Sequence, residues 1–109
     1  MIEVKLFRNS VGHIVRVRAS GHSGLSERGT DTLCAAVSAL VQTAYLAIKD
    51  IGGNVAYSRD SESALFEFEL GADEKRYDED VILRAMSVGL KDLESGFPQN
   101  LKTEELKCL

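Results

Sequence analysis

The sequence predicts an α+β domain of two layers, in which two helices lie against a mainly antiparallel sheet. Two observations carry this prediction. Segments that alternate apolar and polar residues occur in two pairs, and each pair is followed by a segment whose apolar residues recur at helical spacing. The expected order is ββαββα, and the length of 109 residues fits one domain spanning 1–109.

The first pair of strands is expected to form a hairpin. Residues 2–6 and 13–20 alternate apolar and polar side chains, and residues 9–12 between them are a turn cluster, Asn-Ser-Val-Gly. In the second strand, Val15 and Val17 fall on the apolar face. Each strand therefore has one face suited to a core and one suited to water.

The segment 31–51 is predicted to be a helix that is apolar on most of its circumference. Between Leu33 and Ile48 the polar residues are Ser38, Gln42 and Thr43. Such a helix must be covered on more than one side. The sheet can cover one side, and the other side needs the second helix or another subunit.

A second hairpin is expected from residues 54–60 and 64–70, joined by a polar turn. Phe66 and Phe68 point to one face and Glu67 to the other, which suits an antiparallel sheet with one face in water.

The second helix is expected from Tyr77 or Asp78 to Ser95, because acidic residues favour its start and Gly96 ends it. Its predicted buried stripe is Ile82, Met86, Leu90 and Leu93. The last dozen residues are polar, and we expect them to add a short edge strand or to fray.

Composition and charge indicate a soluble protein. No apolar run is expected to reach the roughly 20 residues of a membrane span, and the start of the chain does not resemble a signal peptide, so a cytoplasmic location is expected. The net charge is −4, with six basic against four acidic residues in 1–50 and seven against thirteen in 51–109. This balance disfavours direct nucleic-acid binding and favours a basic partner or substrate. We expect no metal and no cofactor, because two cysteines and two histidines lack ligand spacing.

Chemistry is expected at Cys34, which falls in the first turn of the first helix if Asp31 or Thr30 caps it. The positive end of a helix favours thiolate over thiol. His22 lies at the end of the second strand, within reach as a base across the loop 21–30. Backbone amides at the helix start, that of Cys34 included, are expected to stabilise an oxyanion.

A structural interpretation of the same residues carries about equal weight, because a lone cysteine on an apolar helix is most often a packed core residue. Asp31 is better explained as a helix cap than as a catalytic residue. Ser38 lies one turn beyond Cys34 and is expected either to bond the loop or a catalytic partner, or simply to be a helix-packing residue. His13 is expected at the surface.

The residues from 21 to 38 resemble the signature of the ribosomal-processing cysteine proteases called Prp, the YsxB-like family. The matching segments are Gly21-His22-Ser23-Gly24 and Gly29-Thr30-Asp31-Thr32-Leu33-Cys34-Ala35-Ala36-Val37-Ser38. The resemblance extends over the whole chain in length and element order. The tail with Cys108 is not a family feature.

The resemblance implies a cysteine endopeptidase that removes a short N-terminal extension from a basic large-subunit ribosomal protein, a step that supports ribosome assembly. Cys34 is then the nucleophile and His22 the general base, while Asp31 and Ser38 match further motif positions with supporting roles. Gly21, Ser23, Gly24 and Gly29 belong to a loop expected to close over the substrate. The resemblance also implies a homodimer.

Two other functions compete with a protease. A non-catalytic ribosome-associated binding module would use Cys34 only as a packed residue. A thiol redox protein would need Cys108 as its resolving cysteine, because no other cysteine is present.

Overall fold

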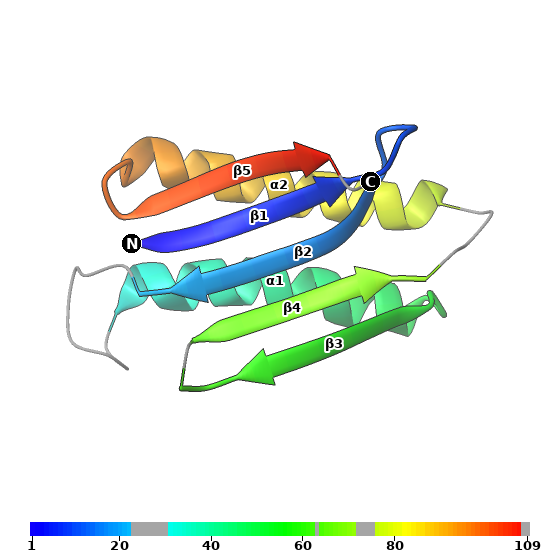
Figure 1. Cartoon of the computed structure of the whole chain (residues 1–109), viewed down its shortest axis with the longest axis horizontal. Helices are drawn as coiled ribbons and strands as arrows, with labels where there is room; N and C mark the ends of the chain where they lie inside the picture. Colours follow the sequence, from blue (N-terminus) through cyan, green and yellow to red (C-terminus); the bar gives the residue numbers. More distant parts are fainter. Residues whose placement is uncertain (23–30, 63, 72–75, 108–109) are drawn as a thin grey trace.

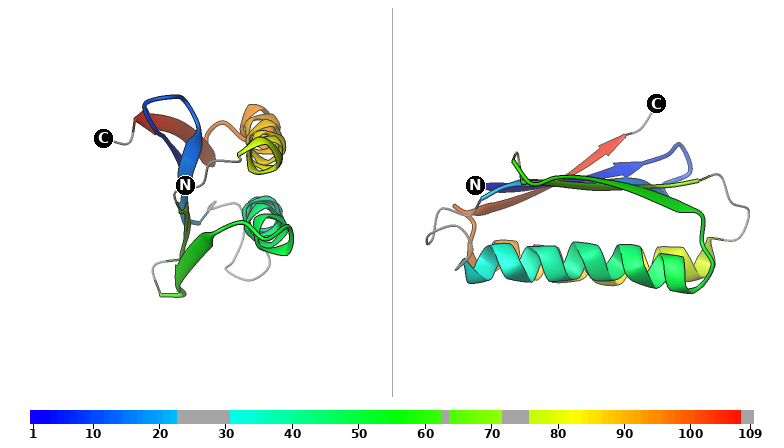
Figure 2. Two further views of the ribbon diagram at one scale, coloured as in Figure 1. Left: turned by 90° about the vertical axis from the view of Figure 1, so that its right-hand side faces the viewer. Right: turned by 90° about the horizontal axis from the view of Figure 1, so that it is seen from below.

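A computed structural model describes residues 1–22, 31–62, 64–71 and 76–107. Five strands form one sheet, and both helices lie on the same face of it (Figures 1 and 2). The elements are β1 Ile2–Arg8, β2 Ile14–Gly21, α1 Thr32–Asp50, β3 Val55–Asp60, β4 Leu65–Leu70, α2 Tyr77–Gly96 and β5 Leu101–Lys107. The predicted two-layer α+β class and the ββαββα order are confirmed.

The sheet has the strand order β3-β4-β2-β1-β5. Its pairs are antiparallel except for β1 and β5, which run parallel in register from Ile2↔Leu101 to Arg8↔Lys107. The C-terminal segment, expected to be a short strand or to fray, is therefore a strand of seven residues. Leu101, the first residue of this strand, is fully buried, and its burial fixes the start of the strand.

A β-bulge changes which residues of β2 face the core. The register shifts between Phe7, which pairs with Arg16, and Arg8, which pairs with Ile14. Val15 has no partner at this point, so the alternation reverses there. Ile14 is consequently buried and Val15 only half-buried, contrary to the expectation that Val15 would point inward.

The core lies between the sheet and the two helices, with Phe68, Leu6 and Ile48 among its largest fully buried side chains. The helices also pack against each other, so closely that a Cβ at Gly89 of α2 would lie 3.0 Å from Leu40 of α1. The sheet and α2 thus cover α1 on two sides, as predicted. The predicted stripe of α2 missed Leu83, which is buried, whereas Ile82 is only partly so.

The apolar character of α1 corrects one expectation. By length and composition alone this helix qualifies to cross a membrane, so the statement that no segment is apolar enough was wrong. The core helix of a soluble protein passes the same test. In the fold, α1 buries Leu33, Val37, Val41, Ala44, Tyr45 and Ile48.

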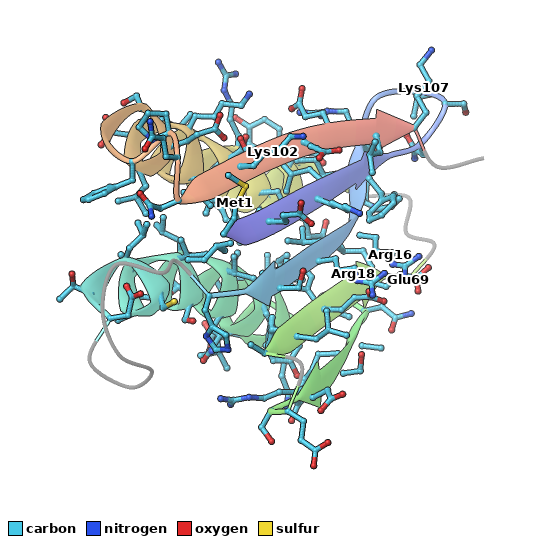
Figure 3. The ribbon with its side chains drawn as sticks, turned by 60° about the vertical axis from the view of Figure 1, so that its left-hand side comes forward. Met1, Arg16, Arg18, Glu69, Lys102 and Lys107 are labelled. Carbon is cyan, nitrogen blue, oxygen red and sulfur yellow. The ribbon has the colours of Figure 1, made fainter. Side chains whose placement is uncertain are left out.

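The face of the sheet opposite the helices carries charged side chains, including Arg16, Arg18 and Glu69 (Figure 3). Glu67 on β4 forms ion pairs with both Arg16, at 2.9 Å, and Arg18, at 3.6 Å, on the neighbouring strand β2. This polar face agrees with the predicted exposure of one side of the sheet.

His13 was expected at the surface and is half-buried. Its Nδ1 lies 2.8 Å from a carboxylate oxygen of Asp80 on α2.

Candidate active site

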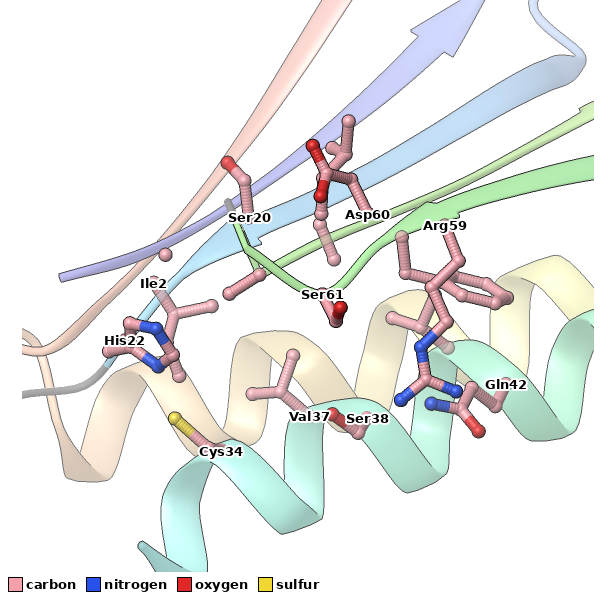
Figure 4. Close-up of a pocket in the computed structure, with 16 residues that line it drawn as sticks. Ile2, Ser20, His22, Cys34, Val37, Ser38, Gln42, Arg59, Asp60 and Ser61 are labelled. Carbon is pink, nitrogen blue, oxygen red and sulfur yellow. The ribbon is translucent and has the colours of Figure 1, made fainter. Parts of the chain in front are cut away.

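A cavity of about 200 Å³ lies where β2 ends, between the first turns of α1 and the turn that joins β3 to β4 (Figure 4). Its walls combine an apolar set of residues with a polar set. The apolar set is Ile2, Ala19, Val37, Val41, Leu65 and Phe66, and the polar set includes Ser20, His22, Cys34, Ser38, Gln42, Arg59, Asp60 and Ser61. The cavity therefore brings together residues that are far apart in the sequence.

Cys34 projects into this cavity from the first turn of α1. It is a half-buried thiol that is not part of a disulfide. Its position is fixed by the helix cap, because one carboxylate oxygen of Asp31 accepts hydrogen bonds from the amides of Leu33 at 3.0 Å and Cys34 at 3.1 Å. Asp31 is buried, with 7% of its surface exposed. The structure thus confirms Asp31 as the N-cap.

This cap corrects the expectation for the oxyanion. The amide of Cys34 was expected to be among the donors to a negatively charged oxygen, but it donates to Asp31, as does the amide of Leu33. An N-cap side chain accepts from these positions of a helix as a rule. The same two amides do not provide an open oxyanion hole in this state of the protein.

His22 reaches the cavity from the end of β2, directly after Gly21. Gly21 has φ +90°, and a Cβ there would lie 2.3 Å from the carbonyl oxygen of Met1. Only glycine fits this close approach at positive φ. The exposed ring of His22 faces the sulfur of Cys34 across the cavity (Figure 4).

The other predicted site residues divide into two groups. Ser38 is exposed and lines the cavity one turn along α1 from Cys34. Ser23, Gly24 and Gly29 lie outside the described residues. Among the residues that the structure does describe, no group of three His, Cys, Asp or Glu side chains is arranged to hold a metal ion.

Two cavity residues were not singled out from the sequence. Gln42 lies eight residues after Cys34 and therefore on the same helix face as Cys34 and Ser38. Its place among the few polar residues of an apolar helix was a usable signal. Arg59 comes from β3, and its approach to α1 depends on how the second hairpin packs, for which the sequence offers no local signal.

A thiol and an imidazole facing each other at the start of a helix, in a cavity with an apolar floor, define a site for cysteine-dependent hydrolysis. The model of the family described as cysteine protease Prp matches residues 1–102. The chain belongs to this family and is a cysteine protease.

Solved structures support the same assignment. The essential ribosomal processing protease Prp from S. aureus, bound to a covalently linked product peptide, has a TM-score of 0.88 at 25% identity and covers 96% of this chain and 99% of its own. The same S. aureus protease with a substrate peptide has a TM-score of 0.84 at 24% identity, with the same coverage. A protein from Streptococcus mutans shares the fold at 21% identity and a TM-score of 0.82, covering 99% of this chain and 96% of its own. A search of curated proteins finds no match.

Proposed function

We propose that this protease removes the N-terminal extension of a large-subunit bacterial ribosomal protein and so supports ribosome assembly. The observation that carries the proposal is the pairing of His22 with Cys34, whose side chains face each other in one cavity although they come from separate elements (Figure 4). The similarity to the S. aureus ribosomal processing protease supports the class of substrate.

In the proposed mechanism, His22 accepts the proton of the Cys34 thiol, and the thiolate attacks the scissile carbonyl carbon. The tetrahedral intermediate collapses to an acyl-enzyme on Cys34 as His22 gives the proton to the leaving amine. Water, activated by His22, then hydrolyses the thioester and restores the thiol. Asp31 supports these steps by fixing the first turn that carries Cys34, and Ser38 supports them by lining the cavity.

The oxyanion needs donors other than the amides of Leu33 and Cys34, since Asp31 occupies both. We assign substrate contact to the loop that contains Gly21, Ser23, Gly24 and Gly29. This loop connects His22 to the helix that carries Cys34. A substrate bound by the loop would therefore lie close to both proposed catalytic residues.

The substrate is expected to be a basic protein, because the enzyme carries a net charge of −4. The apolar floor of the cavity suits an apolar side chain next to the scissile bond. We assign the enzyme to the cytoplasm, where ribosomal proteins are made, with no cofactor, no membrane association and no direct contact with nucleic acid.

We further propose a homodimer formed through the helical layer. Leu46 on α1 and Val81 and Val88 on α2 are each more than half exposed, at 58%, 54% and 60%. Sedimentation velocity should give a dimer for the unaltered chain and a monomer for the Val88→Glu variant. A monomer at every concentration of the unaltered chain would remove this part of the proposal.

The activity is tested by incubating the ribosomal-protein precursor with the enzyme and measuring intact masses. The precursor should lose its extension with the unaltered enzyme and with Cys108→Ser, which controls for the other cysteine. Cys34→Ala should leave the precursor intact, and His22→Ala should slow the cleavage by at least about a hundredfold. Trimming by Cys34→Ala would show that another residue is the nucleophile.

A further inference from the structure

The cavity continues along α1 beyond the catalytic pair, and its far end is built from polar groups. Cys34, Ser38 and Gln42 are spaced four residues apart, so they form one line on the helix face that lines the cavity. Arg59 approaches from β3, and its guanidinium lies next to the carboxamide of Gln42 (Figure 4). The Arg59–Gln42 end is therefore opposite the end where His22 lies.

The guanidinium of Arg59 is available to a ligand. Arg59 is exposed, and within the described part of the chain it takes part in no hydrogen bond or ion pair. The adjacent carboxylate of Asp60 points away from α1 in Figure 4, and one of its oxygens accepts a hydrogen bond from the amide of Glu62 at 3.0 Å. Within the described residues, no ion pair therefore joins Arg59 to this neighbouring carboxylate.

The chemistry of the catalytic pair gives the direction in which a substrate lies. A general base that receives the thiol proton returns it to the leaving amine, so the chain that follows the scissile bond lies on the side of His22. The chain that precedes the bond then runs the other way, past Ser38 toward Gln42 and Arg59. This is the part of the substrate that is cut off.

The spacing identifies which residue of the substrate meets Arg59. Eight residues of helix separate Cys34 from Gln42, which is about 12 Å at a rise of about 1.5 Å per residue. Counted from the residue whose carbonyl carbon Cys34 attacks, an extended peptide covers this length in three or four further residues, at about 3.3 Å each. The attacked residue is the first before the scissile bond, so the fourth or fifth residue before the bond reaches Arg59. The side chain there meets the donor groups of Arg59 and Gln42, which match a carboxylate or a carboxamide.

We propose that Arg59, assisted by Gln42, determines substrate specificity by binding a glutamate or glutamine side chain at the fourth or fifth position before the scissile bond. This inference rests on the proposed function and adds a sequence requirement to it. Glutamate should be favoured over glutamine because its hydrogen bonds to the guanidinium are charge-assisted. Lysine should be rejected, since it would place a like charge beside Arg59.

The test uses synthetic peptides that span the processing site of the precursor, with the fourth or the fifth residue before the bond replaced in turn by Glu, Gln, Ala or Lys. At one of these positions, kcat/KM for the Glu peptide should exceed that for the Ala peptide by about tenfold, and the Lys peptide should be poorer still. Arg59→Ala should make the four peptides nearly equal, and Arg59→Glu should reverse the order in favour of Lys. Arg84→Ala removes an exposed arginine on α2, outside this cavity, and should keep the preference of the unaltered enzyme.

The outcomes separate this inference from the function on which it rests. Equal cleavage of all peptides by the unaltered enzyme, or an unchanged preference in Arg59→Ala and Arg59→Glu, overturns the role of Arg59 and leaves the protease activity standing. Cleavage of none of the peptides, together with an intact precursor, overturns the proposed function and this inference with it.

Discussion

The carboxylate of Asp31 accepts a hydrogen bond from the amide of Cys34, the proposed nucleophile, at 3.1 Å. The same oxygen also accepts from the amide of Leu33. One buried side chain therefore starts the helix and fixes the backbone from which the thiol projects. The position of the thiol and the stability of the helix are coupled through this single group.

Asp31→Ala should lower the free energy of unfolding by about 1 kcal/mol, the usual cost of losing an N-cap side chain. Asp31→Asn keeps an acceptor oxygen and should cost less. Urea denaturation followed by circular dichroism measures both variants. Equal losses for Ala and Asn would show that the charge of Asp31, and not its hydrogen bonds, provides the stabilisation.

Gly21→Ala should impair both stability and cleavage. Its Cβ would lie 2.3 Å from the carbonyl oxygen of Met1 at φ +90°, so the backbone that carries His22 must move. Gly12→Ala is the matched control, because Gly12 has φ +91° with nothing within 4 Å of the added Cβ. The control should lose only the roughly 1–2 kcal/mol of left-handed backbone strain and should keep its kcat/KM. Full activity in Gly21→Ala would contradict the close approach.

Gly89→Val should destabilise the contact between the two helices by about 1–3 kcal/mol through overpacking. Even the first added atom would lie 3.0 Å from Leu40. Gly96→Val is the control on the same helix, since a Cβ at Gly96 meets nothing within 4 Å. Thermal unfolding should give a clearly lower Tm for the change at 89 than for the change at 96, and equal Tm values would argue against tight helix packing.

The Arg8–Glu105 ion pair gives a pH-dependent contribution to stability. The hydrogen bond from Arg8, at 2.8 Å, holds the pKa of Glu105 below its ordinary value of 4.5. A lowered carboxyl pKa stabilises the fold above the ordinary value, and this contribution is lost as the pH falls through the folded-state pKa. The side chains are 36% and 42% exposed, so screening limits the effect to below about 1 kcal/mol.

Glu105→Gln should therefore be slightly less stable than the unaltered protein at pH 7 and equally stable near pH 3. Chemical denaturation across this range measures the difference. A gap in stability that persists at the acid end would mean that packing, and not the ion pair, explains the effect of the substitution.

Local patterns predicted most of the fold because apolar periodicity directly reports which face of an element is buried. Phe66 and Phe68 alternate with Glu67, which indicates a strand. The apolar residues between Leu33 and Ile48 recur at helical spacing, which indicates a helix. The burial of Ile14 could not be predicted in this way, because the β-bulge that turns its side chain inward depends on the pairing with β1. The strand at 101–107 was expected only as one of two alternatives. Its side chains are mostly polar, so they give no apolar pattern for a backbone that pairs with β1.

The sequence pointed to the residues of the proposed site but not to all of their surroundings. Helix geometry relates Cys34 to its cap Asp31, and His22 directly follows β2, the element that precedes α1 in the chain. Arg59 joins the cavity through the packing of a distant hairpin, which no local pattern encodes. The sequence also did not indicate that Asp31 occupies the Cys34 amide, the donor that an oxyanion would need.

The parallel pairing of β1 and β5 has a practical consequence for handling the enzyme. Ile2 lines the same cavity as Cys34 and Met1 touches Gly21, whereas Lys107 lies at the opposite end of the sheet (Figure 3). A purification tag fused before Met1 would emerge beside the cavity that holds the Cys34 thiol and would compete with a peptide for this space. The same tag fused behind β5 would start at the end of the sheet remote from the cavity, so activity measurements are best made with carboxyl-terminal fusions.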